Sequence, residues 1–269
     1  MKIAVLGSTG MLGSMLVKHL NGVETPQLDA SAPFNSELVK TLKDYQWIIN
    51  AIGKIPQRCS SDFEFWKVNA GFPYRLANVA ETLNINVIQI ATDCIYDGKR
   101  GDYTELDAAN PPDVYGKSKL QGEVVSHNMS HIRCSIVGPE THGKSLLGWF
   151  LNQPPGADIK GYTNHYWNGV TTLHFAKVCQ GIISYNLPLP HIHHLVPADR
   201  VSKCELLHLF AKEFGREDIE IEAVDDVRSA NRTLATVDPV LNMKLWALAG
   251  YSKPPTIAQM IKELAEFVK

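Results

Sequence analysis

A tyrosine and a lysine four residues apart are the side chains of this sequence best suited to chemistry. They are Tyr115 and Lys119, in the segment Val-Tyr-Gly-Lys-Ser-Lys. Residues at i and i+4 share one face of a helix, so a helical segment would bring the ammonium close to the phenol. A phenol has an ordinary pKa near ~10, and a neighbouring cation stabilises the phenolate. The pair therefore predicts a tuned proton donor for reduction of a carbonyl group.

A threonine at the end of an apolar run adds a second hydroxyl. Residues 87–91 read Val-Ile-Gln-Ile-Ala, which is typical of a strand, and Thr92 and Asp93 follow directly. We expect the Thr92 hydroxyl to hold the carbonyl oxygen that receives the proton from Tyr115. By itself Tyr115 would be no more than an aromatic residue at the start of a helix. Its interpretation as a catalytic group depends on the glycine motif that opens the chain.

That opening motif predicts a site for a dinucleotide. The apolar residues 2–6 run into Gly-Ser-Thr-Gly-Met-Leu-Gly and then into an amphipathic segment. Gly7 would permit a tight turn, Gly10 would let backbone amides approach a pyrophosphate, and Gly13 would let the helix pack on the strand. The N-terminus of the helix would then face the phosphates. A glycine turn that only joins two elements is the alternative, and its position after the first strand weakens it.

The residue that distinguishes NAD from NADP is harder to identify. An acidic side chain about 20 positions after the glycines usually binds the adenosine ribose, and the candidates are Glu24 and Asp29. Pro26 cannot donate to a strand ladder, so the segment between them is a poor strand. The preference between the two cofactors stays open.

Composition favours a small-molecule partner. The chain has 269 residues, 45% of them hydrophobic, which is enough for a full core. A net charge of −2 gives no electrostatic reason to expect nucleic acid or membrane binding. The sequence has no apolar run of the roughly 20 residues that span a bilayer and no export signal, so we expect a cytosolic protein. The five cysteines form no CxxC pair, and we expect reduced, mostly buried thiols.

Short apolar segments and helical patterns alternate through the first half of the chain. Such alternation indicates βαβ units and predicts an α/β fold, a Rossmann-type doubly wound parallel sheet with helices on both faces. We expect this NAD(P)-binding domain over residues 1–140. The strand segments are 2–6, 46–51, 87–91 and 132–137, and the helical segments are 36–44 and 63–83.

A different organisation begins after Gly138, where the alternation weakens. The Pro-Pro-Gly run at 154–156 would end any helix before it. We expect a small C-terminal substrate-binding lobe from residues 141–164 and 197–269. The chain would return to the first domain over about 165–196, where an apolar stretch at 192–196 could rejoin the sheet. The predicted helices of this half span 172–184, 202–214 and 257–268.

A rival motif lies at residues 138–145. The run Gly-Pro-Glu-Thr-His-Gly-Lys-Ser fits the phosphate-loop pattern and by itself predicts an ATPase or kinase. Pro139 removes a backbone donor from that loop, and the first strand already carries a nucleotide motif in a better setting. We therefore consider the phosphate loop the weaker hypothesis.

Three further groups are assigned structural roles. The first is the histidine cluster His191, His193 and His194, which has no carboxylate or cysteine at ligand spacing nearby, so we predict packing or surface histidines and no metal site. The second is the aromatic group Phe63, Phe65 and Trp66, which would pack a helix. The third is the charged group Glu263, Glu266 and Lys269, which would solvate the last helix.

The order of the motifs resembles that of a known family. After the glycine turn come Asn-Ala-Ile-Gly at 50–53, Ala-Thr-Asp at 91–93, Tyr-Thr-Glu at 103–105 and finally Tyr-Gly-Lys-Ser-Lys at 115–119. Over most of its length the chain resembles the extended short-chain dehydrogenases/reductases, especially the dTDP-4-dehydrorhamnose reductases. The resemblance implies NADPH- or NADH-dependent reduction of a 4-keto-6-deoxy sugar on a nucleoside diphosphate, in surface-polysaccharide or deoxysugar biosynthesis.

The resemblance also implies roles for individual residues. Thr92, Tyr115 and Lys119 would form the catalytic trio, and Lys119 would also bind the nicotinamide ribose. The implied substrate-binding residues are Thr92, Asp93, Tyr115, Trp167 and Asn168. The implied cofactor-binding residues are Gly7, Gly10, Met11, Leu12, Gly13, Asp29, Asn50, Ala51, Ile52, Gly53, Tyr115 and Lys119.

Two departures from the family pattern bear on the substrate. Cys94 stands where the rhamnose enzymes carry an aromatic residue, and a tryptophan is replaced near Ile136. A related nucleotide sugar, with another base or an N-acetyl group, is therefore a candidate alongside the rhamnose precursor. The alternatives are an epimerase or dehydratase of the same fold that recycles its bound cofactor, and a non-catalytic NAD(P)-binding regulatory subunit. We expect a monomer or a homodimer.

Overall fold

The computed structural model describes all residues except 33, 34, 60, 141 and 142, and its chain divides into two compact units. The first unit comprises Met1–Asp97, Ala108–Arg133 and Cys179–His193. The second comprises Gly98–Asp107, Cys134–Val178 and His194–Lys269. Within the described ranges, no helix combines the length and the apolar character needed to cross a membrane.

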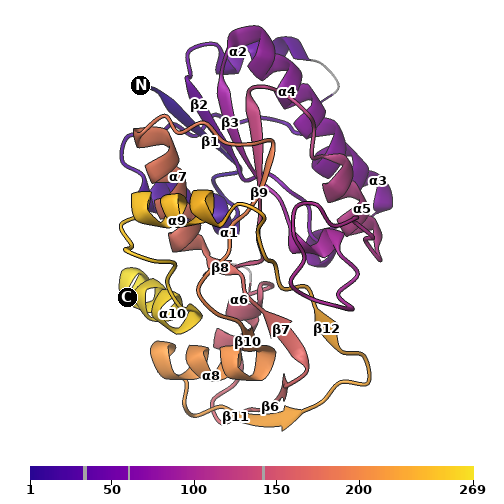
Figure 1. Ribbon diagram of the computed structural model, residues 1–269, viewed down its shortest axis with the longest axis vertical. Helices are drawn as coiled ribbons and strands as arrows, with labels where there is room; N and C mark the ends of the chain where they lie inside the picture. Colours follow the sequence, from indigo (N-terminus) through magenta and orange to yellow (C-terminus); the bar gives the residue numbers. More distant parts are fainter. Residues whose placement is uncertain (33–34, 60, 141–142) are drawn as a thin grey trace. The chain divides into compact units, whose positions relative to one another are not determined.

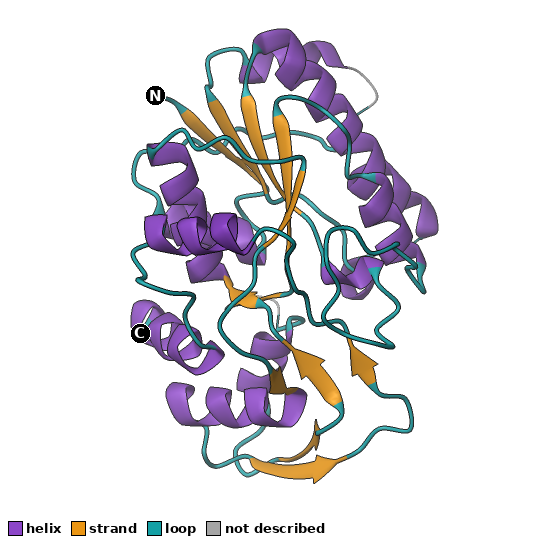
Figure 2. Cartoon of the chain, viewed as in Figure 1, coloured by secondary structure: helices purple, strands orange, loops and turns teal. Residues whose placement is uncertain are grey.

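A parallel sheet forms the centre of the first unit (Figures 1 and 2). Each of its first three strands pairs in parallel with the next, and the short segment predicted at 192–196 joins the far edge, as expected. Among the described residues the strand order is β1 (Ile3–Leu6), β2 (Trp47–Asn50), β3 (Asn86–Ile90), β4 (Met129–Arg133) and β9 (Ile192–His194). This arrangement confirms the Rossmann-type fold class.

Helices cover both faces of this sheet (Figure 1). On one face α2 (Asn35–Leu42) and α4 (Phe72–Leu83) pack against side chains that alternate along the strands, such as Ala4 and Leu6. On the other face lies α1 (Met11–His19), whose His19 ring is 2.9 Å from Gln180 near the end of α7 (Thr172–Ser184). Because both faces are covered, β1 is apolar throughout and β2 is apolar up to its last residue, Asn50.

The predicted helix at 63–83 contains a break in its regular winding. It consists of α3 (Asp62–Phe65), a π-helical segment at Trp66–Gly71, and α4. Of the three aromatic residues expected to pack this helix, only Phe65 is buried. Phe63 and Trp66 are 69% and 40% exposed, and the Lys67 ammonium lies 5.5 Å from the Phe63 ring, so that part of the prediction is wrong.

The predicted strand at 132–137 is divided between the two units. Its first residues end β4, and its last form β5 (Ile136–Val137), which pairs in parallel with β8 (Val170–Thr171). The second unit also contains residues 98–107, which we expected in the first domain. Their backbone explains the difference, because Tyr103 N–H donates to Thr233 and Asn231 N–H donates to Gly98.

Helices and short strands make up the second unit. The predicted helices at 172–184, 202–214 and 257–268 are confirmed to within one residue as α7, α8 (Lys203–Phe214) and α10 (Ile257–Val268). Ser202 and Glu205 form a capping box at the start of α8. The further elements are β6 (Asp158–Tyr162) with β11 (Glu220–Val224), β7 (His165–Trp167) between β10 (Val201–Ser202) and β12 (Ala230–Asn231), α6 (Leu146–Leu151) and α9 (Pro239–Leu248).

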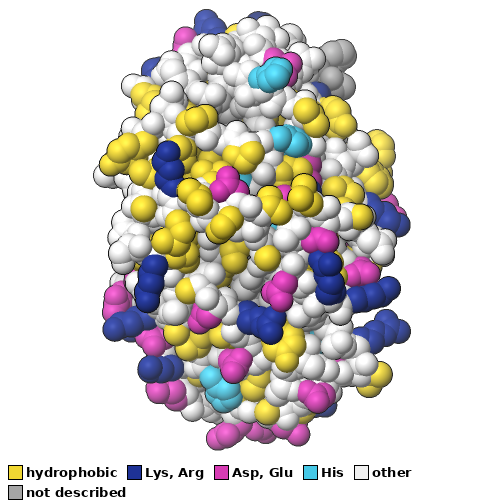
Figure 3. Space-filling model, in the orientation of Figure 1, with side chains coloured by type: hydrophobic (Ala, Val, Ile, Leu, Met, Phe, Trp, Pro, Cys, Tyr) yellow, Lys and Arg dark blue, Asp and Glu magenta, His cyan; other side chains and the backbone are white. Residues whose placement is uncertain are grey.

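Charged side chains of both signs are interspersed over the face shown in Figure 3. This mixture agrees with the near-balanced composition of 26 basic and 28 acidic residues. Of the five cysteines, Cys134, Cys179 and Cys204 are buried, and no disulfide joins any of these described thiols.

Glu263 on α10 corrects one of our predictions. Its carboxylate does not lie on the solvated face but accepts hydrogen bonds from Lys177 at 2.7 Å and from the Tyr251 hydroxyl, and it lies 3.2 Å from the fully buried ring of His174. These bonds, that from His174 first, lower the pKa of Glu263 well below its ordinary value. The network ties α7 to α10 within the second unit.

We expect Glu263→Gln to destabilise the protein at pH 7 by about 2 kcal/mol, the scale of hydrogen bonds to a charged group. A carboxyl whose folded pKa is depressed stabilises the fold above its unfolded pKa of ~4.3, and this contribution disappears as pH falls. Urea unfolding at pH 7 and at acidic pH measures both effects. Glu266→Gln, on the same helix with 62% of its side chain exposed, is the control and should change stability by less than ~0.5 kcal/mol. Equal losses in the two variants would contradict the role of the network.

Candidate active site

The turn after β1 is built around close backbone contacts. Gly7 has a φ of +81°, and a Cβ there would lie 3.0 Å from the carbonyl carbon of Ala51. A Cβ at Gly13 would lie only 2.0 Å from the Gly7 carbonyl oxygen. Gly10 caps α1 without a side-chain hydrogen bond, and the first turn of α1 carries no acidic residue. The N–H groups of this turn, including those of Met11 and Leu12, therefore form a cradle that suits the pyrophosphate of a dinucleotide.

The turn after β2 lies directly beside the glycine turn. Asn50 is fully buried, accepts a hydrogen bond from Ile52 N–H at 3.1 Å and donates to Gln89 at 2.6 Å. Its side chain therefore shapes the turn at residues 50–53 and joins it to β3. The backbone of Ala51, whose N–H donates to Leu6, is the part of this segment in contact with Gly7.

The two candidate ribose-binding acids have different surroundings. Glu24 accepts a hydrogen bond from the Tyr45 hydroxyl at 2.7 Å and forms an ion pair with Lys2 at 3.5 Å. Its backbone forms an isolated parallel β-bridge with Ala4 of β1. The Asp29 carboxylate accepts the N–H of Ser31 at 2.8 Å, and this bond lowers the pKa of Asp29. A tyrosine and a lysine side chain thus contact the Glu24 carboxylate, whereas a backbone N–H contacts that of Asp29.

The helix that carries Tyr115 packs tightly on the turn that follows β3. Asp113 caps α5 (Val114–Gln121) by accepting the N–H of Gly116 at 2.7 Å. A Cβ at Gly116 would lie 2.4 Å from the carbonyl oxygen of Cys94, so only glycine permits this approach. Cys94 belongs to the single turn Asp93–Ile95, which Thr92 caps through its own hydroxyl. Thr92 and Tyr115 are thereby brought within hydrogen-bonding reach of each other.

The half-buried phenol of Tyr115 is held in its neutral form. Burial raises its pKa most, the neighbouring Cys94 and Asp93 raise it further, and a hydrogen bond with Thr92 partly opposes them. We expected the Lys119 ammonium to lower this pKa; the net shift in the structure is upward, because loss of solvation is its largest cause.

Lys119 is almost fully buried on the same helix, at 9% exposure. Its ammonium donates a hydrogen bond of 2.8 Å to the carbonyl of Ile90, the last residue of β3. A buried ammonium requires such partners, because burial without them is costly. Lys119 is thus anchored between α5 and the end of the strand that leads to Thr92.

Two residues expected at the substrate are occupied elsewhere in the second unit. Trp167 is only 3% exposed, and its indole N–H donates to Ser135 at 2.8 Å. The Asn168 amide both accepts from and donates to the backbone of Leu234, at 2.9 and 2.7 Å. These contacts hold both side chains within the fold, and their binding of substrate stays a prediction.

In the rival phosphate-loop motif, a carboxylate of the motif itself binds the backbone amides. Glu140 accepts the backbone N–H groups of Lys144 and Ser145, which a phosphate would otherwise use. Thr141 and His142 lie outside the described residues. The helix that follows, α6, has only six residues.

The clustered histidines are also engaged within the fold, since the His194 ring lies 2.8 Å from the carbonyl oxygen of Ala235.

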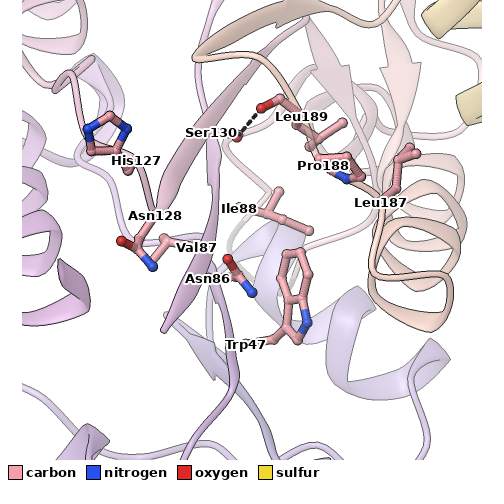
Figure 4. A pocket seen from close by; sticks show the side chains of 10 residues that line it. All are labelled: Trp47, Asn86, Val87, Ile88, His127, Asn128, Ser130, Leu187, Pro188 and Leu189. Atoms are coloured by element: carbon pink, nitrogen blue, oxygen red, sulfur yellow. Dashed lines mark hydrogen bonds between the residues drawn. The ribbon is translucent and has the colours of Figure 1, made fainter. Parts of the chain in front are cut away.

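A pocket of about 130 Å³ lies at the amino ends of β2, β3 and β4 (Figure 4). Trp47 and Ile88 line it, as do Ser130 and Leu189, whose hydrogen bond is 3.5 Å long. None of the predicted site residues lines this pocket. The predicted site instead follows the carboxyl ends of β1, β2 and β3, where ligands of doubly wound sheets bind.

Sequence reasoning missed the residues that hold the site in place. Ser118 donates to the backbone of Tyr115 at 2.8 Å and accepts from Asn69 at 3.1 Å, and Asn69 accepts the N–H of Lys54 at 2.8 Å. Asp113, three residues before Gly116, carries a capping signal that could have been recognised. Asn69 has no comparable signal, because its partners are far away in the sequence.

Comparisons with known proteins agree with this geometry. The family model described as the RmlD substrate binding domain matches residues 1–269. A dTDP-4-dehydrorhamnose reductase of Aggregatibacter actinomycetemcomitans is 33% identical over 187 residues, which is 63% of either chain and so less than two thirds of that relative. A dTDP-4-keto-6-deoxy-D-glucose reductase of Streptomyces niveus is 28% identical over 91% of this chain and 90% of its own.

The fold is likewise similar to solved structures. A dTDP-4-dehydrorhamnose reductase of Bacillus anthracis, crystallised in complex with NADP, superposes with a TM-score of 0.81 at 16% identity and covers 98% of both chains. At that identity the similarity concerns the fold alone. Because the family model matches from the first residue to the last, the chain belongs to the RmlD substrate-binding-domain family.

Proposed function

We propose that this protein uses NADPH or NADH to reduce the keto group of a nucleotide-linked 4-keto-6-deoxy sugar, in deoxysugar or surface-polysaccharide biosynthesis. The observation that carries the proposal is the neutral phenol of Tyr115, hydrogen-bonded to Thr92 beside the carboxyl end of β3. The names of the Streptomyces niveus and Aggregatibacter relatives support the substrate class.

The residues of the first unit fit a nicotinamide dinucleotide. Gly7, Gly10 and Gly13, with the amides of Met11 and Leu12, would hold the pyrophosphate at the start of α1. Asn50, Ala51, Ile52 and Gly53 would line the middle of the cofactor, and Asp29 would lie near its adenosine. When bound, the cofactor supplies a hydride to the substrate carbon. The Bacillus anthracis reductase was crystallised with NADP and other structures of similar fold with NAD, so NADPH and NADH are both candidates.

The chain's own residues would manage the proton. The Tyr115 oxygen is protonated at neutral pH, so the phenol can donate to the carbonyl oxygen of the substrate. The Thr92 hydroxyl would bind the same oxygen and fix its position. The buried Lys119 ammonium would bind the nicotinamide ribose and stabilise the phenolate that remains after proton transfer. Asp93 would contact the sugar.

We expect the choice of sugar and of base to depend on positions at which the side chains of this protein differ from those of the rhamnose enzymes. Cys94 lies next to Asp93 and close enough to Tyr115 to affect its pKa. A thiol there offers less surface for contact with a sugar than an aromatic ring would. We therefore include nucleotide sugars with other bases or with an N-acetyl group among the candidate substrates.

The reaction is tested by incubating the protein with NADPH or NADH and a panel of nucleotide 4-keto-6-deoxy sugars. We expect nicotinamide absorbance to fall in proportion to sugar reduced, and deuterium from labelled NADPH to appear on the carbon of the former keto group. A tightly bound oxidised cofactor that is never consumed would indicate an epimerase or dehydratase instead. Cofactor binding without turnover of any sugar would indicate a regulatory subunit.

We expect Tyr115→Phe to lower kcat by about 10²–10⁴-fold, because it removes the proton donor but preserves the ring. Binding of NADPH, followed by quenching of protein fluorescence, should change little. Tyr74→Phe on α4 is the control, since that hydroxyl is exposed and accepts a hydrogen bond from Gln121. Full activity in the Tyr115 variant would refute the assignment.

We expect Gly13→Ala to weaken NADPH binding by at least about tenfold, or ~1.4 kcal/mol, because its methyl group would displace the Gly7 carbonyl. Titration of NADPH fluorescence measures the loss. Gly71→Ala is the control, since the nearest atom to an added Cβ there is 3.6 Å away. Unchanged NADPH affinity in the Gly13 variant would show that the dinucleotide does not use this turn.

A further inference from the structure

The last residue of β4 makes an unusually complete set of buried contacts. The Arg133 guanidinium donates to both oxygens of the Glu123 carboxylate, at 2.8 and 2.6 Å, and to the Tyr96 hydroxyl at 2.9 Å. The Arg133 and Glu123 side chains are each 5% exposed, and Tyr96 is fully buried. Such a two-pronged arginine–carboxylate pair fixes orientation as well as distance. All three residues belong to the first unit.

The two partners of Arg133 adjoin the two segments that carry the proposed catalytic groups. Glu123 follows Gly122, the residue that caps the end of α5, and α5 carries Tyr115 and Lys119. Tyr96 caps the turn Asp93–Ile95, which Thr92 begins. One guanidinium thus joins the end of α5 to the end of the turn that starts at Thr92.

Further contacts hold the rest of α5. At its start, Gly116 rests directly on the carbonyl of Cys94. Toward its end, Ser118 accepts a hydrogen bond from Asn69 at 3.1 Å, and Lys119 donates to the carbonyl of Ile90 at 2.8 Å. The bonds of Glu123 and Tyr96 to Arg133 add a direct link from the residue after the end of α5 to the far end of the turn that begins at Thr92. We infer that this link, with the contact at Gly116, sets the angle of α5 against the turn.

We propose that Arg133 is a positioning residue, which through Glu123 and Tyr96 sets the distance between the Thr92 hydroxyl and the Tyr115 phenol. This inference rests on the proposed reduction, in which both groups must bind one carbonyl oxygen. A misplacement of about 1 Å can cost ~10²-fold in rate. A buried ion pair is weak evidence for stability, since its desolvation offsets much of its attraction. Precise placement of two segments is the property that it supplies here.

The test uses Tyr96→Phe, which removes one hydroxyl and keeps the buried ring. We expect kcat to fall about tenfold while the KM for NADPH stays within twofold, because the glycine turn is untouched. Tyr45→Phe is the matched control. It removes a tyrosine hydroxyl that also binds a carboxylate, that of Glu24 at 2.7 Å, but beside Lys2 at the start of the sheet, and kcat should not change.

Hydrogen exchange supplies a readout that does not need turnover. In Tyr96→Phe and in Glu123→Gln, amides of residues 92–96 and 114–121 should exchange faster than in the wild type, and those of α2 should not. Wild-type kcat in Tyr96→Phe, or an equal loss of kcat in Tyr45→Phe, would overturn the positioning role. If the wild type reduces no sugar while exchange still rises at these two segments, the attachment stands and the proposed reaction fails.

Discussion

Backbone-to-backbone contact at three glycines is the constraint on which the first unit depends. Gly13 rests on the carbonyl of Gly7, Gly7 rests on the turn at Ala51, and Gly116 rests on the carbonyl of Cys94. A methyl group at any of these positions would meet backbone atoms, which cannot move as a flexible side chain can. The glycines therefore bring the turn after β1 into direct contact with the turn after β2, and α5 into direct contact with the turn after β3. These contacts place groups from distant parts of the chain side by side.

Burial, rather than charge, controls the chemistry of the proposed proton donor. The phenol of Tyr115 loses solvent on one side to the edge of the Phe65 ring, whose centroid lies 6.2 Å away, and Cys94 and Asp93 on the turn after β3 raise its pKa further. Both effects favour the neutral phenol, which is the form that can donate a proton. The hydrogen bond with Thr92 opposes them and prepares the same oxygen for the phenolate state.

Polar networks give each unit its internal connections. In the first unit, Asn69 and Ser118 join the segment at Lys54 to α5, and Arg133 joins α5 to the turn after Thr92. In the second unit, His174, Lys177 and Glu263 connect α7 to α10. Buried polar groups of this kind are tolerated only when they find partners, so each network permits one arrangement of its elements.

Local pattern was sufficient to predict the fold class, and it supplied the residues that we propose for the centre of the site. The glycine turn, the alternation of strands and helices, and the spacing of Tyr115 and Lys119 are short-range features, and each is written in a few neighbouring residues. The order of the strands, the division of residues 132–137 between two sheets and the burial of Trp167 depend on partners distant in the sequence. For the same reason Glu263 resembled a solvated residue, although its carboxylate binds residues of another helix and loop.

The sequence by itself therefore determined which chemical groups are present and on which kind of element each one lies. Only the tertiary structure decided the pKa of Tyr115, because burial and the positions of Thr92 and Cys94 are set by packing between α5 and the turn after β3. It also decided that Trp167 and Asn168 hold the fold and that Arg133 joins two segments. Hydrogen bonds between residues far apart in the chain leave no local pattern, since any polar residue at the right place in space can make them.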